Sequence, residues 1–186
     1  PGVPCFGSPG LREYISRQLR AGVLDPMRER LARLAQRDRL DLFAGIAIGW
    51  ETHIPNYAPG EPHYFINPDA PPVYARPDGE TVTMPAEEMA RGGYAALHWR
   101  GWTEERLVEE AAARGVSRDD LFREMCFDVI QDYSAMLAET AHDAGIPRSR
   151  IFTHIVPMDS VEDTTSTTVP QIRCAVNRYA TPGFTL

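Results

Sequence analysis

The sequence predicts an α/β fold with a parallel sheet, and three segments support this prediction. The apolar run 42–50 is too short and too rich in glycine for a helix and is typical of a strand buried on both faces. A long amphipathic helix follows over 121–140, and a second strand-like segment over 150–156. Strand, helix and strand joined by a short return form a βαβ unit, whose crossover makes the strands parallel and places the helix over one face.

Two amphipathic helices are predicted before the first strand. The first has apolar residues at helical spacing between Leu11 and Leu19. The second begins with Asp25 as its N-cap and Pro26 at its first position, where the missing N–H of proline costs nothing. Its apolar stripe, which we expect to be buried, consists of Met27, Leu31, Leu34 and Ala35.

A long loop is predicted over 51–117, because half of the chain's 16 prolines fall between Pro55 and Pro85. Short helices are expected within it, around 86–96 and 103–114. In an α/β fold, the segment that joins the carboxyl end of a strand to the next helix lies on the ligand-binding face. A connection of this length is more often a binding loop or lid than filler.

The strongest helix signal opens at Ser117 and resembles a capping box in which Asp120 replaces the usual Glu. The helix keeps one apolar face until Gly145 and Pro147, which are typical terminators. Strands are then predicted at 150–156 and, with a weaker pattern, at 171–176.

Composition predicts one domain, residues 1–186, because 43% apolar residues suffice for one ordinary core. The formal charge is −7, and all 19 basic residues are Arg, so Lys-dependent Schiff-base chemistry is excluded within this chain. An acidic balance without a basic patch argues against a nucleic-acid partner. No apolar run reaches about 20 residues and no signal pattern precedes the first helix, so we expect a soluble, cytoplasmic protein without a membrane partner.

No cofactor is expected, since nucleotide-binding glycine motifs and a nucleophile elbow are absent from the sequence. Cys5, Cys126 and Cys174 are odd in number and widely spaced, which favours small core residues over disulfides or structural zinc.

Glu51 is the predicted catalytic residue, because it directly follows the first strand and stands beside Trp50 and His53. Burial against an indole raises the pKa of a carboxyl group toward neutrality, the condition for a general acid. The alternative is a solvated Glu at the start of a loop.

Further candidate groups surround this position in the predicted topology. The residues expected to bind substrate come from three places in the chain. Trp50 directly precedes Glu51, His53, His98 and Trp99 belong to the long loop, His154 lies near the end of the second strand, and Asn177 and Tyr179 follow the third. We expect Glu51, His154 and Asn177 to meet at one mouth, because each follows a strand at its carboxyl end. A metal site of Glu51, His53, His98 and His154 is a weaker alternative, since their spacing matches no metal motif.

Aromatic residues are moderately enriched between 50 and 102, and their flat faces suit sugar rings, although such residues also anchor loops by burial. They are Trp50, Tyr57, Tyr64, Phe65, Tyr74, Tyr94, Trp99 and Trp102.

The segments 43–51, 144–147 and 151–154 together resemble part of a (β/α)8 barrel of the glycoside-hydrolase type, in the clan of beta-galactosidases and cellulases. The resemblance implies an acid/base Glu after the fourth barrel strand, which Glu51 matches, and a nucleophilic Glu after the seventh, beyond Leu186. Trp50 stands where that clan usually has Asn.

The expected function is therefore a hydrolase of O-glycosidic bonds acting on a saccharide substrate. A non-catalytic carbohydrate-binding protein on a degenerate barrel and a metal-dependent sugar enzyme remain alternatives. About 250 residues make a complete barrel, so the chain would be an incomplete one. Its unpaired edges would require self-association or the missing C-terminal part of the chain.

Overall fold

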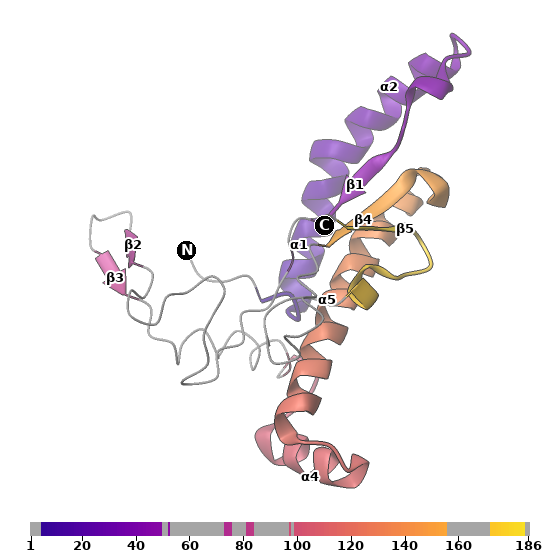
Figure 1. Cartoon of the computed structure of the whole chain (residues 1–186). Helices are drawn as coiled ribbons and strands as arrows, with labels where there is room; N and C mark the ends of the chain where they lie inside the picture. The colour runs from indigo at the N-terminus through magenta and orange to yellow at the C-terminus, as the bar shows by residue number, and fades with distance from the viewer. Residues whose placement is uncertain are drawn as a thin grey trace.

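The computed structural model describes residues 5–49, 52, 73–75, 81–83, 97, 99–155 and 172–184. Its main sheet has three parallel strands in chain order, β1 (Ile46–Ile48), β4 (Ile151–Ile155) and β5 (Thr181–Phe184) (Figure 1). The prediction of a mixed helix and strand fold with a parallel sheet is confirmed. These described residues do not form a closed barrel.

Helices cover one face of this sheet. The N-terminal layer contains α1 (Pro9–Leu19), η1 (Arg20–Leu24) and α2 (Asp25–Ala35), and the crossover helix is α5 (Arg118–Asp143). Ile48 and Ile151 share one core with Ile15 of α1 and Leu137 of α5. Thr153 aligns with Ile48 on this face, whereas Ala47 aligns with Phe152 on the opposite one. The core therefore lies between the sheet and the α1–α5 layer.

The predicted N-cap at Asp25 is wrong, because the chain is already helical there, with φ −65° and ψ −47°. A capping residue needs an extended backbone. Helix α1 continues into α2 through the π-helical turn η1, which lies just before Pro26. Proline inside a helix lacks an N–H and clashes with the preceding turn, and a wider turn relieves that clash. The expected stripe of α2 is only half-buried at Met27, Leu31 and Leu34, and Ala35 is exposed.

The first predicted strand is shorter than expected and lies at a sheet edge. Leu42 belongs to the 3-10 turn η2 (Leu40–Leu42) and is exposed, and Ala47 is exposed within β1. Gly45 and Gly49 flank β1 with φ values of +145° and +79°, which an extended strand does not adopt. The two glycines therefore confine β1 to three residues.

The predicted helices around the crossover are confirmed. Thr103 caps α4 (Glu104–Arg114), accepting a hydrogen bond from the Arg106 N–H, and Ser117 caps α5 in the same way through Asp120. Gly145 ends α5 with φ +93°, and the Ile146 N–H bonds to the Ala141 carbonyl. This is the Schellman arrangement. Eleven buried residues line α5: Leu121, Phe122, Cys126, Phe127, Val129, Ile130, Tyr133, Ser134, Leu137, Ala138 and Ala141.

Two of the three cysteines are core residues, as predicted. Cys126 and Cys174 are buried in one cluster, and burial raises the pKa of the Cys126 thiol to about 12. Cys5 is only half-buried, and none of the three forms a disulfide.

The expected long loop 51–117 contains a small antiparallel sheet of β2 (Val73–Ala75) and β3 (Thr81–Thr83), besides α4. The predicted helix at 86–96 lies outside the described residues.

The third predicted strand, 171–176, is wrong. Residues Ile172–Ala175 form the 3-10 helix η4, which packs on α5 and β4, and the strand β5 begins only at Thr181. The buried hydroxyl of Thr153 donates a hydrogen bond of 2.8 Å to the Ala175 carbonyl and so attaches η4 to the sheet. The remaining short element, η3 (Arg148–Arg150), leads directly into β4.

None of the described helices combines the length and the apolar character needed to cross a bilayer.

Candidate functional site

The carboxyl ends of β1 and β4 lie side by side. Ile48 pairs with Thr153, so the next residue of β1, Gly49, lies beside His154. Gly49 is two residues before Glu51 in the sequence. The predicted parallel direction of these two strands is therefore confirmed.

Glycine is needed at position 49 for two reasons. Its φ of +79° is in the region that L-residues avoid. A Cβ atom there would lie 3.3 Å from the carbonyl oxygen of His154. The backbone therefore turns away from the sheet in close contact with β4.

His154 is half-buried and lies on the sheet face opposite to α5, since its neighbours Thr153 and Ile155 are buried on the α5 side. Its partner on β5 is Gly183, and a Cβ there would lie 2.5 Å from the Thr153 carbonyl oxygen. Gly183 adds no side chain beside the imidazole.

Several predicted site residues lie outside the described part of the chain, namely Trp50, Glu51, His53 and His98. Their predicted roles stay predictions. Thr52, between Glu51 and His53, is buried. A buried hydroxyl at this point was not predicted, and its neighbours in the sequence give no signal for it.

Trp99 presents its indole to solvent, with 58% of the residue exposed. Leu97, on one side of Trp99, is buried. On the other side, the guanidinium of Arg100 contacts the carboxylate of Asp132 of α5 at 2.5 Å. The segment is thus attached to α5 on both sides of an exposed aromatic ring.

Asn177 and Tyr179 do not follow a strand, and their predicted place beside His154 is wrong. They precede β5, so they lie at the amino end of the sheet. The Asn177 carboxamide accepts a hydrogen bond of 2.9 Å from the Tyr179 N–H, and the Tyr179 hydroxyl donates to Glu139 of α5. Both side chains serve local structure there.

A metal site is not formed by the described residues, in which no three His, Cys, Asp or Glu side chains converge. Of the four residues considered as ligands, only His154 belongs to the described set. The metal alternative therefore stays a prediction.

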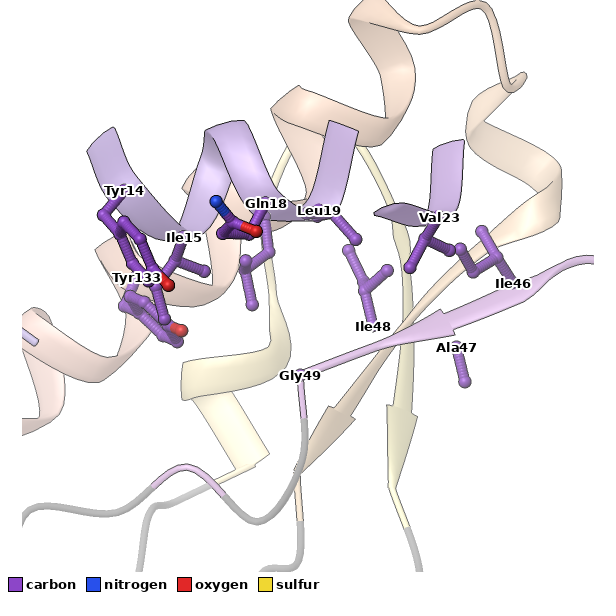
Figure 2. A pocket seen from close by; sticks show the side chains of 11 residues that line it. Tyr14, Ile15, Gln18, Leu19, Val23, Ile46, Ala47, Ile48, Gly49 and Tyr133 are labelled. Atoms are coloured by element: carbon purple, nitrogen blue, oxygen red, sulfur yellow. The ribbon is translucent and has the colours of Figure 1, made fainter. Parts of the chain in front are cut away.

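An apolar groove of about 550 Å³, which the sequence did not predict, lies between α1 and the outer edge of β1 (Figure 2). Tyr14 is 52% exposed at one end of the groove, beside Tyr133 of α5 (Figure 2). Burial raises the pKa of the Tyr133 phenol. The groove lining consists of Tyr14, Ile15, Gln18, Leu19, Val23, Ile46, Ala47, Ile48, Gly49, Tyr133 and Leu137.

Comparison of the chain with protein-family models, with curated proteins and with solved structures finds no match.

Proposed function

We propose that the protein is a carbohydrate-active hydrolase that cleaves O-glycosidic bonds, with Glu51 as its general acid/base. The supporting observation is the register of β1 and β4, which brings Gly49, two residues before Glu51, beside His154 at the carboxyl edge. In α/β folds this edge is where ligands bind.

The finer fold that accompanies this proposal is an incomplete (β/α)8 barrel. The three strands neighbour one another in chain order, and α1 and α5 pack in one layer on one face. A doubly wound sheet reverses its strand order and carries helices on both faces, whereas a barrel does neither.

In the proposed reaction, the carboxyl group of Glu51 protonates the leaving glycosidic oxygen. A second carboxylate is required on the opposite side of the sugar ring, as nucleophile or as base for water, and the resemblance puts it beyond Leu186. His154 would bind a sugar hydroxyl. The partner of the site is a saccharide, with no nucleic acid or membrane involved.

The test compares the rates at which glycosides with different leaving groups are hydrolysed. It uses a protein that contains this chain together with the rest of the proposed barrel. In Glu51→Gln, hydrolysis of a methyl glycoside should fall by about 10²–10⁴-fold, the usual contribution of general acid catalysis. A dinitrophenyl glycoside should lose much less in its bond-cleavage step, because its leaving group needs no proton.

Glu109→Gln on the exposed surface of α4 is the matched control and should hydrolyse both substrates normally. Equal losses for the two leaving groups in Glu51→Gln, or no loss for either, would contradict the assignment of Glu51 as the acid.

The exposed indole of Trp99 supports a second candidate, a carbohydrate-binding protein without catalysis. Aromatic rings stack on the apolar faces of sugars. In that case Trp99→Ala would weaken saccharide binding in a calorimetric titration, Glu51→Gln would bind normally, and no glycoside would be hydrolysed. Any measurable turnover that depends on Glu51 rules this candidate out.

A further inference from the structure

The free edge of β1 and the groove beside it form one continuous surface. Among the residues that the structure describes, β1 pairs with β4 on one side and with no strand on the other. An edge strand presents unpaired N–H and C=O groups that can pair with a further strand. The opposite edge strand, β5, contains Pro182, which has no N–H to donate. Of the two edges, β1 is the better suited to strand addition.

We propose that a second copy of this chain covers this surface in a two-fold dimer, with the β1 strands antiparallel and the α1 helices side by side. This dimer and a complete barrel are alternatives at the edge of β1, because in a closed barrel the preceding strand pairs with that edge.

The charge distribution favours a second copy over an unlike partner. In a two-fold interface, residues near the axis lie opposite their own copies, so a charged group there repels itself. None of the eleven groove residues is charged, although 24% of the chain is. The side of α1 that lines the groove carries no charged residue, and such a surface suits contact with an identical copy of itself.

The shape of α1 also fits its own copy. Tyr14 and Val23 are exposed by 52% and 46% at the two ends of the groove wall, and Gln18 is exposed between them (Figure 2). When α1 and the adjoining turn η1 of two copies lie antiparallel, Tyr14 in α1 of one copy comes opposite Val23 in η1 of the other. The axis then passes near Gln18, about midway between them. Each helix thus supplies the apolar side chains that fill the other copy's groove.

Sedimentation or light scattering of the purified chain tests the proposal directly. The unmodified chain should be a dimer, and Val23→Glu should weaken association by more than tenfold because it brings like charges together at the interface. Val116→Glu is the matched control, since Val116 is 44% exposed and lies between α4 and α5. It should remain dimeric. Circular dichroism checks that both variants are folded.

Disulfide trapping tests the position of the axis. In a Cys5→Ser background, Gln18→Cys should form a cross-linked dimer on mild oxidation, because Cys126 and Cys174 are buried. Arg17→Cys, exposed at the adjacent position of α1, should not.

A monomeric chain at all concentrations would overturn the proposal, as would a dimer that Val23→Glu leaves intact. Open-ended oligomers would also overturn it, because they require an interface between two different surfaces. Equal cross-linking of Gln18→Cys and Arg17→Cys would contradict the two-fold axis at α1.

Discussion

The two ends of the parallel sheet are built in different ways. At the amino end, polar side chains bind the backbone or one another: the Arg150 guanidinium donates to the carbonyls of Phe43 at 2.7 Å and Ala44 at 3.1 Å, and Tyr179 donates to Glu139. These groups are used by the fold itself. They are not available to bind a ligand.

At the carboxyl end, the described residues on either side of His154 in the sheet are glycines. Gly49 and Gly183 both lie beside His154, and a Cβ atom at these positions would lie 3.3 Å and 2.5 Å, respectively, from a carbonyl oxygen of β4. The difference teaches that polar side chains hold the sheet together at the amino end, whereas at the carboxyl end the described strands are held close together by two glycines. Variants at the two ends should separate stability from binding.

The largest effect is expected from Gly45→Ala at the amino end. Its Cβ would lie 2.6 Å from Cε2 of Phe152 and 2.7 Å from the Arg150 carbonyl oxygen, at φ +145°. Because alanine is disfavoured at this φ and its Cβ would clash with two neighbours, the free energy of unfolding should fall by about 2–4 kcal/mol in urea titrations. Gly10→Ala, within α1 and without neighbours inside 4 Å, should instead stabilise by about 0.5–1 kcal/mol. Equal effects would show that the contact at Gly45 is absent.

Arg150→Met should come second, lowering the free energy of unfolding by about 1–3 kcal/mol, because the carbonyls of Phe43 and Ala44 lose a charged donor. The comparison is Arg148→Met, an exposed residue in the same 3-10 turn, which should change stability by less than about 0.5 kcal/mol. Thermal melts of both variants measure this difference. Equal melting temperatures would contradict the stabilising hydrogen bonds from Arg150 to Phe43 and Ala44.

Gly49→Ala at the carboxyl end should cost about 1–2 kcal/mol, since alanine is disfavoured at φ +79°. Gly115→Ala, at φ +69° with no neighbour inside 4 Å, measures the backbone cost alone. Denaturation of each variant gives its loss in free energy of unfolding. The loss in Gly49→Ala minus the loss in Gly115→Ala is the cost of the 3.3 Å approach to His154. A smaller loss at Gly49 than at Gly115 would mean that the close approach does not exist.

The smallest effects on stability are expected from Tyr179→Phe at the amino end and His154→Gln at the carboxyl end. Together these variants test whether the two ends differ in function. Tyr179→Phe removes the hydrogen bond to Glu139 and should lower stability by about 0.5–1.5 kcal/mol without changing saccharide affinity. His154→Gln should do the opposite, weakening saccharide binding at nearly unchanged stability. Calorimetric titration with an oligosaccharide decides this, and loss of affinity in Tyr179→Phe would return the residue to the site that the sequence predicted.

The sequence predicts those parts of the fold in which local pattern and tertiary burial agree. Helix α5 has an apolar face, a Ser117 cap and a Gly145 terminator, and the structure contains all three. Strand β4 alternates as expected between buried and half-buried positions. The parallel direction of β1 and β4 follows from the βαβ pattern alone.

Strand β5 could not be predicted, because Thr181, Pro182, Gly183 and Phe184 include two residues that are poor in strands. Pairing with β4 selects this segment. The alternation of Ile172 and Cys174 resembles a strand, yet it forms the 3-10 helix η4 against α5. This shift along the chain moves Asn177 and Tyr179 to the other end of the sheet. The sequence does not predict the groove beside α1, because the apolar pattern of a helix does not show which other element packs against it.

The continuous helix through α1 and α2 has a consequence for the dynamics of the chain. None of the residues of α2 is buried, whereas α5 buries eleven. The backbone hydrogen bonds of α2 can therefore open by local fraying, without the rest of the molecule unfolding. Amide hydrogens of α2 should exchange with deuterium orders of magnitude faster than those in the middle of α5, where exchange requires global unfolding. The molecule thus carries a helix whose stability is set by its own sequence, attached to one whose stability is that of the core.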